Sequence, residues 1–179
     1  MNATRVHQVP ELEALLPPSI AGRPLSRWSV RGRCWLELTI SRPPADLDAF
    51  VAGFETPNDQ HKIDLTNLTY GVAGRSDTSK DPPYFVFGAA RPQDRDETSV
   101  AVALLFGGSS FNDITAADDL ANYQEQTIAG KQVYVGSADM LAQTEHQRGR
   151  PFLYQNDDYM FLVITNDDAW AADAIRQLP

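Results

Sequence analysis

Residues 150–179 constrain the fold of this chain more than any other stretch, because they change character in a clear order. Residues 152–155 and 159–164 are rich in aromatic and aliphatic side chains, and Asn156, Asp157 and Asp158 lie between them. Short Asx side chains tolerate the backbone of a tight turn, so this pattern predicts a β-hairpin. Residues 159–164 are apolar at every position, which predicts a central strand that is covered on both faces.

A helix is predicted to follow this hairpin from about Asp167. Thr165 and Asn166 are suitable N-cap residues, while Asp167 and Asp168 place negative charge at the positive end of the helix dipole. Three apolar residues then recur at i, i+4 and i+7 and form one stripe: Ala171, Ile175 and Leu178. Turn and cap chemistry therefore explains the acidic pairs of this region without a binding site.

The same signals predict the other elements. One helix covers residues 12–16 and ends at Pro17-Pro18, and a second opens at Pro43-Pro44 and ends near residue 56. Strands are predicted at residues 28–30, 34–40, 65–73 and 84–87, and a further helix at 114–123. Residues 100–106 are too few for their period to separate strand from helix, although the flanking residues favour a helix.

Two segments of the chain echo each other. Residues 19–25 read Ser-Ile-Ala-Gly-Arg-Pro-Leu, and residues 127–133 read Thr-Ile-Ala-Gly-Lys-Gln-Val. Strand signals and an amphipathic helix follow each, so the sequence predicts two duplicated ββα units at 19–56 and 127–179; chance similarity of short apolar segments is the alternative. Such units predict an α+β fold with helices on one face of a mainly antiparallel sheet. The length of 179 residues suits one domain, 1–179.

Charge and hydropathy limit the classes of partner. The formal net charge is −9, which disfavours nucleic acid and anionic membranes. No window approaches a membrane span, so direct membrane insertion is not expected, and residues 1–20 lack the apolar core of a signal peptide. These features predict a cytoplasmic protein, and an exported or anchored domain whose signal has been removed is the alternative.

Three features resemble uncharacterised bacterial proteins, some of them exported or lipid-anchored. They are residues 11–17 (Glu-Leu-Glu-Ala-Leu-Leu-Pro), the turn at Gly22 with Leu25 after it, and the closing strand and helix. The resemblance covers the two ends of the chain better than its middle. It implies no activity and transfers no functional residue, but it supports the exported alternative.

No catalytic or metal-binding motif is present in the sequence. Cys34 is the only cysteine, which excludes an internal disulfide and a zinc site built from several thiolates. His7, His61 and His146 lack metal-ligand spacing, and the aspartates occur as adjacent pairs rather than at the alternating positions of a calcium loop. There is no Gly-x-Ser-x-Gly elbow and no phosphate-binding loop. We therefore predict no metal, no cofactor and no identifiable catalytic residue.

The one basic stretch on this acidic chain, residues 27–35, is the candidate interface. It contains two of the three tryptophans, and tryptophan and arginine often anchor protein interfaces. The candidate binding residues are Trp28, Arg31, Arg33 and Trp35. The alternative is that both tryptophans belong to the core and the arginines line a solvated turn.

Two functions of different class are therefore predicted. The first is a non-catalytic protein-binding or assembly domain that meets a protein partner or forms a homo-oligomer. The second is a small enzyme or ligand carrier with a pocket between sheet and helices.

Overall fold

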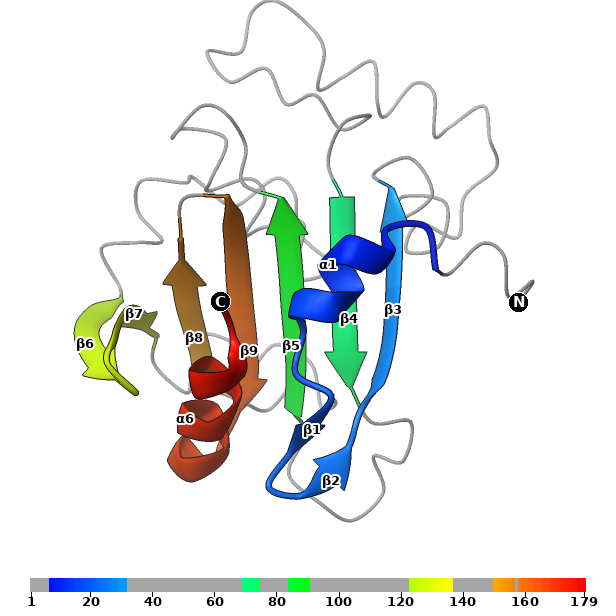
Figure 1. Cartoon of the computed structure of the whole chain (residues 1–179). Coiled ribbons are helices and arrows are strands. Elements are labelled where there is room, and N and C mark those ends of the chain that lie inside the picture. The colour runs from blue at the N-terminus through cyan, green and yellow to red at the C-terminus, as the bar shows by residue number, and fades with distance from the viewer. Residues whose placement is uncertain (1–6, 32–68, 75–83, 91–122, 137–149, 157) are drawn as a thin grey trace, which may run out of the picture.

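A seven-stranded antiparallel sheet forms the centre of the computed structural model, which describes residues 7–31, 69–74, 84–90, 123–136, 150–156 and 158–179 (Figure 1). Across the sheet the strands follow the order β3 (Ser26–Arg31), β4 (Thr69–Gly74), β5 (Tyr84–Ala90), β9 (Tyr159–Thr165), β8 (Arg150–Gln155), β7 (Lys131–Val135) and β6 (Gln124–Ile128). Every neighbouring pair is antiparallel. A short ribbon, β1 (Ser19–Ile20) and β2 (Arg23–Pro24), stands apart from this sheet.

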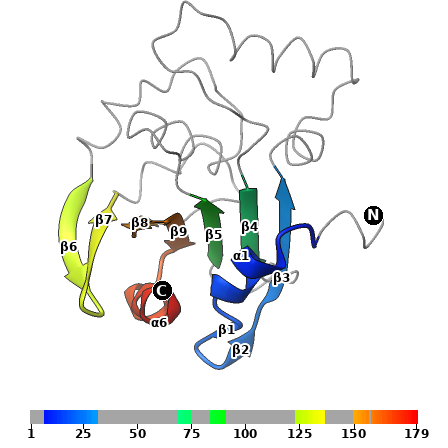
Figure 2. The same ribbon diagram turned by 45° about the horizontal axis from the view of Figure 1, so that its top comes forward.

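Two helices lie on the same face of the sheet, as Figures 1 and 2 show. Helix α1 (Pro10–Leu15) contacts β3, β4 and β5, and helix α6 (Asp168–Gln177) contacts β9 as well as β1 and β6. The predicted α+β class, with a mainly antiparallel sheet and helices on one face, is therefore confirmed. None of the described helices is long and apolar enough to cross a membrane.

Strand β9 is the central strand, the fourth of seven, as its apolar sequence predicts. Phe161 and Val163 face the helices, while Met160 and Leu162 point to the opposite face, because side chains alternate along a strand. All four are fully buried. The hairpin before β9 is also as predicted: Asn156 Oδ1 accepts hydrogen bonds from the backbone N–H groups of Asp158 (3.1 Å) and Tyr159 (2.7 Å).

A pair of glycines lets α1 lie close to the sheet. Gly71 of β4 and Gly88 of β5 are partners in the register, on the face that the helices cover. A Cβ atom at Gly71 would lie 3.0 Å from Leu16 Cδ1 and 3.1 Å from Leu12 Cγ, and one at Gly88 would lie 3.1 Å from Leu16 Cδ2. Side chains at these two positions would therefore push α1 away from the sheet.

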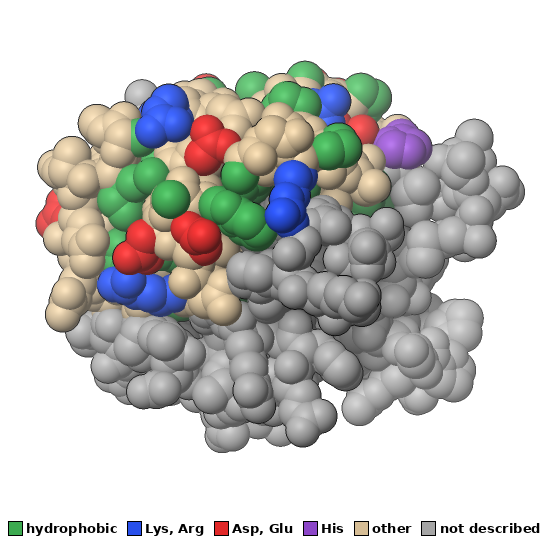
Figure 3. Space-filling model, turned by 90° about the horizontal axis from the view of Figure 1, so that it is seen from below, with side chains coloured by type: hydrophobic (Ala, Val, Ile, Leu, Met, Phe, Trp, Pro, Cys, Tyr) green, Lys and Arg blue, Asp and Glu red, His purple; other side chains and the backbone are tan. Residues whose placement is uncertain are grey.

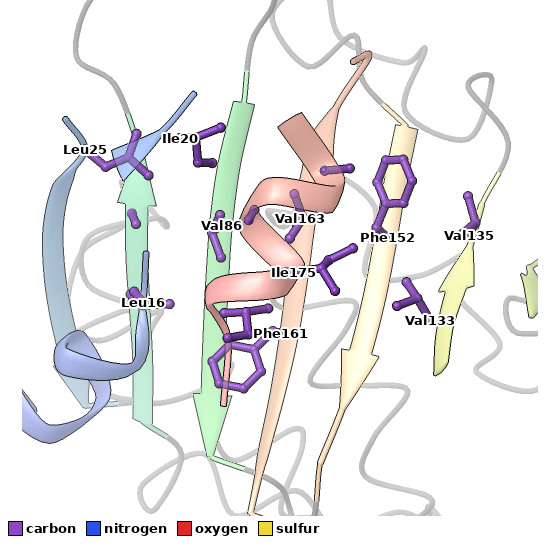
Figure 4. Packing of buried hydrophobic residues seen from close by; sticks show 14 residues of the cluster. Leu16, Ile20, Leu25, Val86, Val133, Val135, Phe152, Phe161, Val163 and Ile175 are labelled. Carbon is purple, nitrogen blue, oxygen red and sulfur yellow. The ribbon is translucent and has the colours of Figure 1, made fainter. Parts of the chain in front are cut away.

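Helix α6 is seated by its predicted stripe, since Ala171, Ile175 and Leu178 are all buried. Figure 4 shows Ile175 beside Val163 and Phe152 of the sheet, in the cluster that also holds Leu16. The expected N-cap was wrong. Asp167 caps the helix, and its Oδ1 accepts from the backbone N–H groups of residues 169 (2.9 Å) and 170 (3.1 Å).

The two echoing segments adopt the same turn. Ala21 and Gly22 join β1 to β2 with φ of 49° and 74°, and Ala129 and Gly130 join β6 to β7 with φ of 53° and 82°. Positive φ at both central residues is the geometry of the type I′ hairpin. The first hairpin pairs with itself alone, whereas the second belongs to the main sheet.

The duplication itself stays a prediction. The strand expected at 34–40, the helix at 43–56 and the undecided segment 100–106 lie outside the described residues, as do residues 65–68 of the predicted strand 65–73. Of the helix predicted at 114–123, the structure describes Tyr123 alone, which is not helical.

Candidate functional site: the two edges of the sheet

The outer edge of β3 is closed by the chain's own N-terminal segment, residues 7–9. The backbone N–H of Gln8 donates to Ser29 O (3.0 Å), and Gln8 Oε1 accepts from the backbone N–H of Arg31 (2.9 Å). His7 forms a parallel bridge with Ser29. Two backbone groups that this edge strand would present to another chain, Ser29 C=O and Arg31 N–H, are thus already used.

Three side chains of chemically active types converge behind this edge: Ser29, Glu13 and His7. Ser29 Oγ donates to Glu13 Oε1 (2.5 Å), and His7 Nδ1 lies 3.0 Å from Glu13 Oε2. A nucleophilic triad needs the histidine next to the hydroxyl, with the carboxylate beyond it. Here the carboxylate lies between the other two.

Ser29 is also unsuited to attack a substrate, because its residue is fully buried and its Oγ accepts a hydrogen bond from the backbone N–H of Val9 (2.8 Å). Chemically, the cluster ties the N-terminal segment and α1 to β3. It is a packing network, and no sequence pattern predicted it, because the residues that bond to one another are 6 to 20 positions apart.

Arg27 of β3 extends this network to the end of α1. Its Nη1 donates to the backbone carbonyls of Glu13 (3.2 Å) and Leu16 (3.3 Å). The last carbonyls of a helix have no partner within the helix and carry partial negative charge, so a guanidinium stabilises them. Arg27 therefore has a structural role, since its guanidinium is already bound to the end of α1.

The predicted interface residues do not form one surface as far as the structure describes them. Trp28 is half-buried and Arg31 is exposed, and both belong to β3. They point to opposite faces of the sheet, because side chains alternate along a strand and these two positions differ by three, an odd number. Arg33 and Trp35 lie outside the described residues.

The opposite edge of the sheet, β6, is open in the described part of the chain. Ile128 and Lys131 are the pair that closes the two-residue turn, so Ile128, Gln126 and Gln124 bond to β7. The alternate residues, Glu125 and Thr127, direct their backbone N–H and C=O groups outward, and both side chains are exposed. Within the ranges described, β7 is the only strand that pairs with β6.

The half of the sheet that ends at β6 is held to α6 by a cation from β7. Lys131 Nζ donates to the carbonyl oxygens of Leu178 and Pro179 and lies 4.9 Å from the centre of the Tyr154 ring. Tyr154 donates its own hydroxyl to Pro179 O (2.7 Å). Partial burial lowers the pKa of Lys131 from its ordinary value. Lys131 thus binds carbonyl oxygens just after the C-terminal end of α6, as Arg27 does at the end of α1.

The β1–β2 hairpin holds the other flank of α6. The backbone N–H of Ala21 donates to Asp173 Oδ2 (2.9 Å), and the Arg23 guanidinium lies 5.4 Å from the centre of the Trp170 ring.

On the face that Figure 3 shows, hydrophobic side chains are interspersed with acidic and basic ones. Neither positive nor negative charge dominates the described part of that face, so it does not form a binding site for a highly charged ligand.

Two further observations bear on chemistry. Among the described residues no three His, Cys, Asp or Glu side chains are grouped so that they could hold a metal ion. Burial raises the pKa of Tyr70 above its ordinary value of 10.0, and its side chain lies inside the core rather than in a reactive position.

No protein-family model, no curated protein and no solved structure matches this chain. The residues themselves are therefore the basis on which its function is inferred.

Proposed function

We propose that this chain is a non-catalytic protein-binding or assembly domain that meets its partner along the outer edge of β6. The observation that carries the proposal is the contrast between the two edges. Residues 7–9 occupy the β3 edge, while Glu125 and Thr127 present outward backbone groups at the β6 edge that no other described residue pairs with.

An extended segment of a partner would add a strand to this edge. Main-chain hydrogen bonds to Glu125 and Thr127 would supply the affinity, and side chains at alternate positions the specificity. The net charge of −9 disfavours nucleic acid, which supports a protein partner. β6 contains neither lysine nor proline, two residues by which proteins protect an exposed edge.

The alternative, a small enzyme or ligand carrier, requires polar groups that converge on an accessible cavity. In the described part of the chain, Ser29, Glu13 and His7 do converge, but the serine is buried and hydrogen-bonded to the carboxylate. That arrangement favours the binding function over hydrolysis.

The test is to select short extended peptides from a random displayed library against the full chain, then to measure them against variants at one residue. Thr127→Pro removes an outward N–H without touching the β6–β7 ladder, and proline is tolerated on edge strands. We expect Thr127→Pro to weaken the selected peptides about tenfold or more, and Thr127→Val, which keeps the N–H, to bind normally. Peptides that bind all three proteins equally would refute the role of this edge.

A further inference from the structure

The hydrogen-bonding groups of the β6 edge are arranged symmetrically about Gln126. Glu125 and Thr127 lie one residue to either side of it, and each directs one N–H and one C=O outward. A two-fold axis perpendicular to the sheet, just outside the edge beside Gln126, places Thr127 of a second copy opposite Glu125 and Glu125 of that copy opposite Thr127. An edge with this property is complementary to itself, as the interface of a two-fold dimer requires.

We propose that β6 pairs with β6 of a second copy of this chain, antiparallel and centred on Gln126. This inference rests on the proposed function, protein binding along the outer edge of β6. In this register Glu125 lies opposite Thr127 of the second copy, and the two exchange both backbone hydrogen bonds. The same pair recurs by symmetry, which gives four inter-chain hydrogen bonds. The two sheets thereby become continuous across the dimer axis.

The side chains favour this register over its neighbours. A shift that centres the pairing on Glu125 places the two carboxylates directly opposite each other, and like charges so placed are destabilising. A shift that centres it on Thr127 brings Glu125 opposite Ala129, a residue of the turn with φ of 53°, where a ladder cannot continue. Pairing about Gln126 uses all four outward groups and opposes no like charges.

The chemistry at the centre is also self-complementary. The two Gln126 side chains meet at the axis, and a primary amide both donates and accepts hydrogen bonds. Thr127 Oγ1 donates to Gln132 Oε1 in the single chain (3.3 Å), on the face that Glu125 shares. This hydroxyl therefore has a partner within its own chain, on the side of β7, and the dimer does not depend on it.

The experiment measures the self-association of the full chain by sedimentation equilibrium and native mass spectrometry over a wide concentration range. We expect a dimer whose dissociation constant rises about tenfold or more in Thr127→Pro and in Glu125→Pro, but not in Thr127→Val. Thermal unfolding of dilute samples checks that the proline variants are folded.

A charge series tests the register without relying on proline. Thr127→Lys places a cation opposite Glu125 twice in the dimer, and Thr127→Glu places an anion there twice. Because a cross-strand charge pair contributes a modest amount, we expect Thr127→Lys to tighten the dimer about two- to thirty-fold and Thr127→Glu to loosen it by a similar factor. Equal association of these two variants overturns the register.

Amide hydrogen exchange separates this inference from the function on which it rests. The N–H groups of Glu125 and Thr127 should gain protection as the concentration of the chain rises, while those of Gln126 and Ile128, bonded to β7, should be protected throughout. A chain that stays monomeric at millimolar concentration refutes self-pairing. If the library peptides nevertheless protect Glu125 and Thr127, the binding function stands with a different partner; if they do not, both proposals fail.

Discussion

The two ends of the sheet differ in how their outer backbone groups are used. At β3, a segment only three residues long supplies backbone and side-chain hydrogen bonds, and the Glu13–Ser29 contact locks it in place. At β6, the two residues whose backbone groups face outward, Glu125 and Thr127, have exposed polar side chains. Closing an edge thus takes very little chain, provided that buried polar contacts keep it in register.

The helices of the two halves show a related difference. Helix α6 has ten residues and its own side-chain cap in Asp167. Helix α1 has six residues and no side-chain cap at its start. Helices this short are not stable by themselves, so α1 depends on Leu12, Leu16 and the glycine pair beneath them. The half with the closed edge therefore depends more on tertiary contacts.

The largest expected effect is at Leu12, which is fully buried between α1 and the sheet. Leu12→Ala should lower the free energy of unfolding by about 2–5 kcal/mol, through lost burial and the cavity that remains. Ile128→Ala is the matched variant in the other half, where the side chain is partly buried, and should cost less. Urea denaturation of both proteins measures this, and equal losses would contradict the comparison.

A smaller effect is expected at Glu13. Glu13→Ala leaves the buried Ser29 hydroxyl without its acceptor and should cost about 1–3 kcal/mol in unfolding free energy. It should also loosen residues 7–9, which would speed amide exchange at Arg31, whose N–H is bound by Gln8.

The control for Glu13 is Glu11→Ala, an exposed acid of the same helix, which should leave the stability and the exchange at Arg31 nearly unchanged. Glu13→Gln retains an acceptor oxygen and should fall between the two. A stable Glu13→Ala protein with an unaltered Arg31 amide would show that other contacts close this edge.

The smallest effect is expected only at alkaline pH. There the contributions of Tyr70 and Lys131, one from each half, to the free energy of unfolding should change with opposite sign. Burial raises the pKa of Tyr70, so above pH 10.0 the unfolded chain loses a proton that the folded chain keeps. Stability should then fall by up to about 1.4 kcal/mol per pH unit from this residue. Partial burial lowers the pKa of Lys131, so its contribution should rise slightly as pH approaches its ordinary value of 10.5.

Urea denaturation between neutral pH and pH 11 measures both contributions in single variants. Tyr70→Phe should flatten the alkaline loss, and Lys131→Met should steepen it slightly, because it removes the opposing term. An alkaline loss that is identical in Tyr70→Phe and the unaltered chain would assign it to other groups.

Local patterns in the sequence were sufficient for much of the C-terminal half. The all-apolar run predicted a central strand, Asn156 its turn, and the spacing of Ala171 and Ile175 the buried stripe of α6, and the structure confirms each. These features depend on residues within a few positions of each other. The N-cap was placed one or two residues too early, because Thr165, Asn166 and Asp167 are all capable caps and tertiary packing decides among them.

The candidate site required the tertiary structure. In the sequence, residues 27–35 stood out by composition, yet Arg27 serves the end of α1 and Trp28 and Arg31 face opposite ways. The polar residues Glu125–Thr127 showed no sequence pattern of a binding site. Whether a strand lies at the edge depends on the strand order of the sheet, which the local sequence does not contain. Sequence by itself determined the closing hairpin and helix of this protein and the class of its fold. Strand order, and with it which backbone groups face outward, was decided by contacts between residues far apart in the chain.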